Sequence, residues 1–303
     1  MSASFSSALA ASAEAASAQH YPQGALYVVA TPIGNLSDIT LRALHVLALA
    51  DTVACEDTRH TQSMLRAYGI DKGAHQLMAV HQHNESEAAN AVIDHLRAGR
   101  RVAFVSDAGT PGISDPGARL VAAVQAQGLR SLPLPGASSV TTLLSVAGIA
   151  AQEGSGAFVF QGFLSSKATE RDRAVDALAS EPRAVVLLEA PHRIEALLAA
   201  LARLGDRPVT VGRELTKQFE EIATLPAQQL PQWLADDANR LRGEFALVVH
   251  PAAAQVIQGP DTRVVKLLLE HLPLKTAVKL AAEITGQSRN ALYDAALEMK
   301  KAV

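Results

Sequence analysis

The 303-residue sequence is 49% hydrophobic and has a formal net charge of −3, which allows a sizeable core and about two domains at the usual ~100–200 residues each. The charge argues against a strongly basic nucleic-acid scaffold but leaves open an RNA enzyme with a local basic patch. No apolar run approaches the roughly 18 residues that cross a membrane, and the single cysteine, Cys55, excludes intrachain disulfides and indicates a reducing cytoplasm. Cys55 follows an apolar run, so we expect a buried structural thiol there and not a nucleophile.

The amino-terminal segment, residues 1–23, is rich in alanine and serine and contains no lysine or arginine. A secretory signal would need a basic start and a longer apolar stretch, so we expect a disordered tail. Residues 24–150 then alternate short apolar runs with helical patterns, and the predicted strands are 26–30, 51–55, 77–80, 102–106 and 130–134. This alternation predicts a mostly parallel sheet with right-handed crossovers.

Every polar, glycine-rich segment of this first predicted domain falls at the carboxyl end of a strand. In the central one, Asp107 and Gly109 come directly after strand 102–106, and Asp115 and Pro116 are placed as the cap and first residue of the next helix. Ligands bind at the carboxyl edge of parallel sheets, where small residues allow close approach and a carboxylate accepts hydroxyl or ammonium groups. A simple tight turn would use the same glycines, so both interpretations stay open.

A second α/β domain is predicted over residues 151–254, after a linker of small residues at 151–156. Its predicted strands are 158–163, 184–190, 209–215, 221–225 and 245–250, with helices over 169–178, 194–204 and 227–235. Segments 208–215 and 220–225 are too close together for a crossover helix, so they should form an antiparallel hairpin in a mixed sheet.

A helical region is predicted over residues 259–303, with helices 275–284 and 289–299 separated by a short glycine-containing turn. This spacing is typical of a helix–turn–helix, and a small helical cap packed on the second domain explains it equally well.

Several common site signatures are missing from the sequence. No G-x-G-x-x-G follows the first strand, and the Walker A and G-x-S-x-G patterns are absent. His81 and His83 are too close together for a usual zinc pair and no cysteine pair exists, so we predict no metal site.

Five segments together resemble one family, the ribosomal RNA small subunit methyltransferases I of the tetrapyrrole-methylase superfamily. They are VATPIGNLSD (29–38), CEDTR (55–59), SDAGTPGISDPG (106–117), PGASS (135–139) and EAPHR (189–193), within a resemblance that covers about 24–250 and extends into the helical tail. The first loop reads TPIGN instead of the G-x-G-P-G-D of tetrapyrrole enzymes, which is the pattern of the RNA branch.

The resemblance implies two α/β domains with S-adenosylmethionine in the cleft between them. It also implies methylation of the ribose 2′-hydroxyl of a decoding-region cytidine in 16S rRNA, within the small ribosomal subunit, by a homodimeric enzyme without membrane attachment. By motif, the cofactor-binding positions are Pro32, Gly34, Asp107, Ala108, Gly109, Ile113, Gly136, Ala137, Ser138, Leu188, Leu215 and Ala246. A tetrapyrrole or protein substrate for the same fold, and a non-catalytic RNA-binding assembly factor, are the alternatives.

Methyl transfer from a sulfonium is an in-line displacement, in which alignment of the reactants can supply ~7–11 kcal/mol. A base or cation that favours the alkoxide would help the ribose hydroxyl. The candidates at predicted strand ends are Glu56, Asp57, Arg59, His81, His83, Glu189, Arg193 and Lys217, and from these we select Asp57, Arg59, Glu189 and Lys217 as catalytic. For each, a surface salt bridge or a helix cap is the alternative.

Basic residues just past strand 158–163 are the predicted RNA contacts, namely Lys167, Arg171 and Arg173. Phosphate contacts would make the affinity salt-dependent, although a solvated helix face explains the same residues. Because only 4% of residues are aromatic, we expect shape recognition of an assembled subunit and not extensive base stacking.

Overall fold

A computed structural model describes residues 5–81, 84–113, 117–149, 156–252 and 262–301. The chain forms two compact units, Met1–Pro251 and Ala252–Val303. The predicted helix cap at Asp115 and Pro116, the candidate His83 and most of the predicted linker 151–156 lie outside the described residues.

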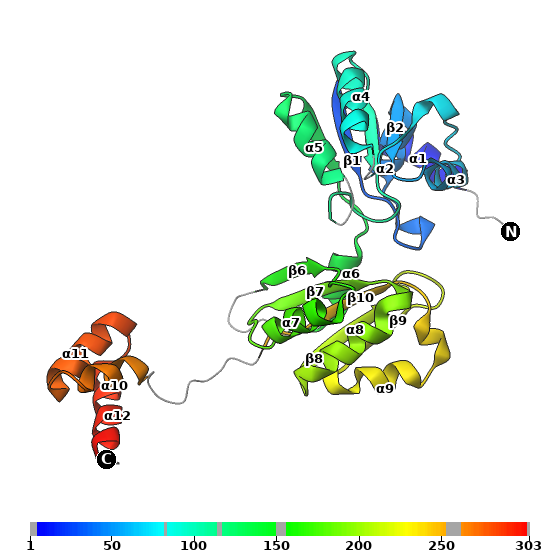
Figure 1. Ribbon diagram of the computed structural model, residues 1–303. Helices are drawn as coiled ribbons and strands as arrows, with labels where there is room; N and C mark the ends of the chain where they lie inside the picture. Colours follow the sequence, from blue (N-terminus) through cyan, green and yellow to red (C-terminus); the bar gives the residue numbers. More distant parts are fainter. Residues whose placement is uncertain (1–4, 82–83, 114–116, 150–155, 253–261, 302–303) are drawn as a thin grey trace. The chain divides into compact units, whose positions relative to one another are not determined.

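The first sheet is entirely parallel, with strand order β3-β2-β4-β1-β5. Figure 1 labels its strands β1 and β2 and the helices that accompany the sheet. Its strands are β1 (Ala25–Val29), β2 (Thr52–Cys55), β3 (Leu77–Ala79), β4 (Val102–Val105) and β5 (Arg130–Leu134). In the centre of the sheet, Tyr27 of β1 is in register with Ala103 of β4 and Leu132 of β5. The predicted parallel sheet is therefore confirmed, and the carboxyl ends of its strands lie along one edge.

Helices bury both faces of this sheet. They are α2 (Leu41–Leu49), α3 (Thr58–Ala67), α4 (Glu85–Arg97) and α5 (Gly117–Ala126). The side chains of β1 alternate between two cores: Tyr27 and Val29 pack with residues of α2 and α3, whereas Leu26 packs with residues of α4 and α5. Burial on both faces explains why these strands read as continuous apolar runs.

The amino terminus forms a helix, α1 (Ser6–Ala16), which lies beside α2. The ring of Phe5 meets Tyr68 edge-on with centroids 5.1 Å apart, and Ser12 and Ala16 are buried. The expectation of a disordered tail is therefore wrong over residues 6–16. Alanine favours helices strongly, and its small side chain lets the helix pack closely on α2.

The second sheet is mixed, with strand order β6-β7-β10-β8-β9. Its strands are β6 (Phe158–Gly162), β7 (Ala184–Glu189), β8 (Pro208–Arg213), β9 (Glu221–Pro226) and β10 (Phe245–Val249). Only β6 and β7 pair in parallel, and β8 and β9 form the predicted antiparallel hairpin. The mixed sheet is confirmed.

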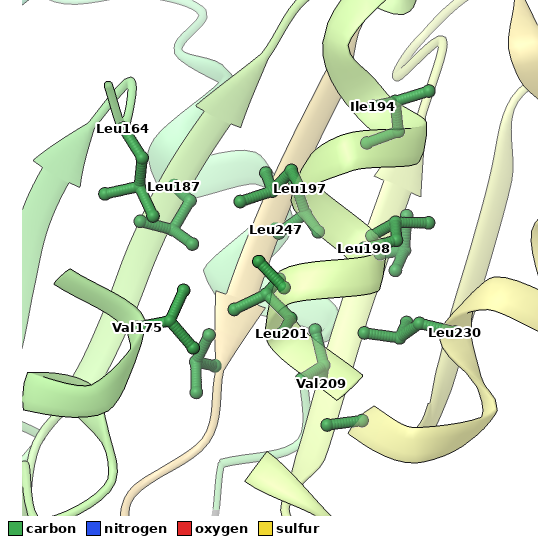
Figure 2. Packing of buried hydrophobic residues seen from close by; sticks show 14 of the residues in the cluster. Leu164, Val175, Leu187, Ile194, Leu197, Leu198, Leu201, Val209, Leu230 and Leu247 are labelled. Atoms are coloured by element: carbon green, nitrogen blue, oxygen red, sulfur yellow. The ribbon is translucent and has the colours of Figure 1, made fainter. Parts of the chain in front are cut away.

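One face of the second sheet is covered by α7 (Ala168–Leu178), α8 (Ile194–Leu201) and α9 (Leu230–Ala235). Figure 2 shows the apolar side of α8, with Leu197 and Leu201, packed over Leu247 and Val209 of the strands. The described part of the unit Met1–Pro251 also contains short 3-10 helices in both halves: η1 (Leu36–Asp38), η2 (Ala74–Gln76), η3 (Pro191–Arg193), η4 (Ala202–Leu204), η5 (Ala227–Gln229) and η6 (Ala238–Leu241).

The opposite face of the second sheet is covered by α6 (Ser139–Val146), whose Leu143 packs in one core with Val186, Ala246 and Val248. This helix follows β5 of the first sheet and was expected to belong to domain 24–150, yet its apolar side packs on the second sheet. Its hydrophobic periodicity predicted a helix but not which sheet it would cover. The chain therefore passes from one sheet to the other directly after β5.

The carboxy-terminal unit contains α10 (Arg263–Leu269), α11 (Leu274–Thr285) and α12 (Arg289–Lys301) around a small apolar core. Gly286 ends α11 in the left-handed conformation, at φ +69°. No helix in the described ranges is both long and apolar enough to span a bilayer.

Candidate functional site

A cavity of about 470 Å³ is formed by loops that follow strands of the first sheet, by α6, and by strands and loops of the second sheet. Its size lies in the range of small-molecule sites, roughly 300–1,000 Å³. Of the twelve predicted cofactor positions, those that line it are Asp107, Ala108, Gly109, Ile113, Ser138, Leu188, Leu215 and Ala246. These positions are spread over about 140 residues of sequence, and the fold brings them to one cavity.

The other predicted cofactor positions support the walls of the cavity. Thr31, just before the buried Pro32, exchanges backbone hydrogen bonds of 2.9 and 3.1 Å with Gly109. The carbonyl of Ala137 accepts a 3.0 Å hydrogen bond from the Thr110 hydroxyl. At Gly136, a Cβ would lie 2.8 Å from the Cβ of Ala30, so only glycine allows this approach.

Hydrogen bonds that involve acidic residues join the loops after β2 and β4 at the cavity. The Asp107 N–H donates to Glu56 Oε1 at 3.3 Å, and the Asp57 N–H donates to Asp107 Oδ1 at 3.2 Å. Gly109 follows at φ +80°, a conformation that favours glycine. The predicted ligand loop thus has a defined backbone shape and presents a carboxylate to the cavity.

Asp57 and Arg59 lie beside the cavity and do not line it. The Asp57 carboxylate caps α3, accepting from the Arg59 and His60 N–H groups at 2.8 and 3.3 Å. The Arg59 guanidinium, 91% exposed, lies 3.1 Å from Asp57 Oδ2. Hydrogen bonds from Arg59 hold the pKa of Asp57 below its usual range, so this side chain is a carboxylate at neutral pH.

Glu189 does line the cavity, at the end of β7, and its side chain is 1% exposed. Its Oε1 lies 3.1 Å from Arg193 Nε and accepts the Ala190 N–H at 2.9 Å. Arg193 also donates to the Leu164 carbonyl, which ties the loop after β6 to the end of β7. This buried carboxylate is therefore held in one orientation.

Lys217 lies outside the cavity lining, although its neighbour Leu215 is part of it. The Lys217 ammonium lies 2.9 Å from Glu214 Oε1 and 3.0 Å from Glu244 Oε2. His81 lies beyond β3, where its N–H donates to Asn84 Oδ1 at 2.8 Å, and it does not line the cavity.

The predicted RNA contacts gather at the start of α7. Lys167 Nζ pairs with Glu170 Oε1 at 3.0 Å, Arg171 donates to the Ser166 carbonyl at 3.3 Å, and Arg173 is exposed. Lys167 is thus partly neutralised by an acidic neighbour.

Several lining residues were not predicted as part of the cofactor site: Ile33, Ser106, Thr110, Ser139, Val140, Phe163, Ala190, Pro191, Glu244 and Phe245, together with Glu56 and Glu189, which were predicted for other roles. Phe163 is the last residue of the predicted strand 158–163, and Glu244 directly precedes the predicted strand 245–250, which is the only signal the sequence offers for them. Their place in the lining depends on how the two sheets pack.

The lining is mostly apolar and includes four carboxylates, those of Glu56, Asp107, Glu189 and Glu244. Carboxylate oxygens accept hydrogen bonds from hydroxyl and ammonium groups and favour a cationic ligand. Within the described part of the chain, no group of three or more His, Cys, Asp or Glu side chains is arranged to hold a metal ion.

Comparison with known families matches residues 25–231 to the tetrapyrrole (corrin/porphyrin) methylases. The chain belongs to this family. Ribosomal RNA small subunit methyltransferase I of Pseudomonas aeruginosa is 45% identical over 281 residues, covering 91% of this chain and 97% of that protein. Residues 258–300 match the RsmI C-terminal HTH domain, in agreement with the predicted helix–turn–helix spacing.

Solved structures of tetrapyrrole methylases share the fold at low identity. Cobalt precorrin-4 methyltransferase matches with TM-score 0.55 at 17% identity, covering 77% of this chain and 98% of that one. A uroporphyrin-III C-methyltransferase from Thermus thermophilus, complexed with S-adenyl homocysteine, matches with TM-score 0.50 at 17% identity, covering 74% and 96%.

Membership of this methylase family assigns S-adenosylmethionine to the chain as its cofactor. The lining fits that molecule: its carboxylates would accept hydrogen bonds from ammonium and hydroxyl groups and favour a positive charge, and Leu188, Leu215 and Ala246 would supply an apolar wall. At Gly109, a Cβ would lie 3.2 Å from Cγ2 of Ile33, so glycine lets this loop pack closely against the TPIGN loop.

Proposed function

We propose that this chain methylates the ribose 2′-hydroxyl of a decoding-region cytidine in 16S rRNA. The observation that carries the proposal is that eight cofactor positions implied by the family motifs line one acidic cavity, in a chain 45% identical to a protein named ribosomal RNA small subunit methyltransferase I. The TPIGN loop supports the RNA branch, because Ile33 itself lines the cavity where tetrapyrrole enzymes have a different loop.

S-adenosylmethionine, when bound, supplies an electrophilic methyl group on a sulfonium. Asp107 and Glu189 would hold its hydroxyl and ammonium groups, because both carboxylates line the cavity and are fixed by hydrogen bonds from neighbouring residues. Leu188, Leu215 and Ala246 exclude water from the apolar side of the site.

Asp57 and Arg59 would act on the RNA side of the site. They follow the end of β2, where the Asp57 N–H donates to Asp107, and the Asp57 carboxylate, which is ionised at neutral pH, would accept a hydrogen bond from the ribose hydroxyl and orient it. The exposed Arg59 guanidinium suits a phosphate contact. Lys167, Arg171 and Arg173 would add phosphate contacts of the salt-dependent kind.

The test is incubation with labelled S-adenosylmethionine and, separately, small ribosomal subunits lacking the modification, naked 16S rRNA and uroporphyrinogen. Label in the subunits that is recovered as 2′-O-methylcytidine after digestion supports the proposal, and a Glu189→Gln variant should label at a much lower rate. Label in uroporphyrinogen alone would overturn it in favour of a tetrapyrrole enzyme. Tight RNA binding with no label in any substrate would indicate an assembly factor.

A further inference from the structure

The turn between β8 and β9 has an unusual backbone. Glu214 and Thr216 are the non-glycine residues with positive φ in the described chain, at 51° and 66°. A β-branched residue such as Thr216 rarely adopts this conformation, which persists only where surrounding contacts determine it. Contacts with the rest of the chain therefore hold this turn in its conformation.

Contacts from Glu244, which directly precedes β10, and from within the turn hold its conformation. The Glu214 N–H donates to the Glu244 carbonyl at 3.0 Å, and the Glu244 N–H donates to Glu214 Oε1 at 2.9 Å. The Thr216 N–H donates to Glu220 Oε2 at 2.6 Å. Lys217 completes this set, because its ammonium joins Glu214 and Glu244 at 2.9 and 3.0 Å.

The same turn meets the first loop of the other sheet. Thr216 Oγ1 accepts the Asn35 N–H at 3.1 Å, although the two residues are 181 positions apart. At Gly34, a Cβ would lie 2.4 Å from Lys217 Cγ and 3.1 Å from the Leu215 carbonyl. The Lys217 stem therefore packs directly on the TPIGN loop.

Between these contacts lies Leu215, which is 6% exposed, packs with Leu143 and Ala246, and lines the cavity. Its position depends on the strained residues on either side of it.

We propose that Lys217 is a positioning residue: its ammonium, held between Glu214 and Glu244, locks the strained turn so that Leu215 forms a wall of the donor cavity and Thr216 fixes the TPIGN loop. This inference rests on the proposed function, since it takes the cavity to be the methyl-donor site. With its charge shared between two carboxylates and its side chain outside the lining, Lys217 acts through Leu215 and the loop.

The test compares Lys217→Met, Lys217→Arg and the control Arg183→Met, which removes a cation from a surface pair with Glu181 at the far end of β7. Titration calorimetry with S-adenosylhomocysteine and steady-state kinetics with S-adenosylmethionine are the readouts. We expect Lys217→Met to weaken binding and raise the donor KM about tenfold, while kcat at saturating donor stays within about twofold, as for loss of ground-state binding alone. The arginine variant should recover most of the affinity, and Arg183→Met should match wild type.

Thr216→Val provides a second variant, since it keeps the shape of the side chain and removes the acceptor for Asn35. It should weaken donor binding in the same direction. Wild-type affinity in both Lys217→Met and Thr216→Val would overturn the inference, as would a large loss of kcat in Lys217→Met with donor affinity intact. If wild type itself binds no donor, the proposed function fails instead, so the two failures are distinguishable.

Discussion

The backbone N–H of Asp57 donates to the carboxylate of Asp107 across 3.2 Å and thereby joins the ends of β2 and β4. The two residues are 50 positions apart, yet both stand at the carboxyl edge of the parallel sheet. This contact orients one Asp107 oxygen toward α3 and couples the two loops that carry the predicted donor-binding and catalytic groups.

Asp107→Ala should weaken donor binding tenfold or more, because a hydrogen bond to a charged group contributes about 1.5–3 kcal/mol. Calorimetry with S-adenosylhomocysteine measures the effect. Asp206→Ala is the matched control, since that carboxylate accepts a hydrogen bond from Gln228 in an exposed loop away from the cavity lining. Unchanged affinity in Asp107→Ala would remove Asp107 from the site.

Cys55 should make the stability depend on alkaline pH. Burial, reinforced by the charges of nearby Asp107, Asp57 and Glu56, raises the pKa of its thiol from 9.0 to about 11. Between these values the unfolded chain loses a proton that the folded chain keeps, so the free energy of unfolding falls as the pH rises, by roughly 2–3 kcal/mol in total.

Denaturant unfolding at several pH values from 8 to 11 measures this effect. The difference between wild type and Cys55→Ala should shrink as the pH rises through that window, because only wild type carries the thiol. A constant difference across the window would contradict the raised pKa of Cys55.

Arg207→Met should lower the free energy of unfolding by about 2–4 kcal/mol, because it leaves three partly buried carbonyls without their charged donor. Arg207 donates to the His250 and Glu181 carbonyls at 2.6 and 2.9 Å and also to that of Leu178. Arg203→Met, which breaks only exposed ion pairs with Asp172 and Asp176, should cost no more than about 1 kcal/mol. Urea titrations of both variants measure the free energy of unfolding. Equal decreases for Arg207→Met and Arg203→Met would contradict this role for Arg207.

Phe5→Ala should destabilise the protein by about 1–2 kcal/mol, less than the ~3–5 kcal/mol of a fully buried phenylalanine, because its ring is only partly buried against Tyr68. Phe219→Ala is the control, since that ring is 71% exposed and its loss should change stability by less than about 0.5 kcal/mol. The midpoints of thermal unfolding of the two variants and of wild type measure the difference. Identical midpoints for wild type and Phe5→Ala would mean that α1 does not contribute to the stability of this unit.

The strands were predictable because the apolar runs are short and are bounded by polar residues, glycine or proline. β5 has the predicted bounds 130–134, and the other strands differ from their predicted bounds by at most two residues at either end. The amino-terminal helix α1 was missed because alanine- and serine-rich composition is shared by flexible tails and by closely packed helices. Only the fit of that segment against α2 and Tyr68 distinguishes the two.

The lining of the cavity was predictable where its residues lie in motifs and unpredictable where it depends on packing between the sheets. Asp107, Ala108 and Gly109 follow a strand, so their place at the sheet edge was implied by topology alone. Phe163 and Glu244 line the same cavity without any motif, because α6 brings the second sheet against the loops of the first.

By itself the sequence determined the alternation of strands and helices, the parallel and mixed sheets and the motifs of the methylase family, because these depend on residue type within short stretches of chain. Only the tertiary structure decided that α6 covers the second sheet, that Lys217 is held by two carboxylates, and that Asn35 meets Thr216. Those contacts join residues far apart in sequence, and their geometry is set by how two buried cores pack together, which no local pattern encodes.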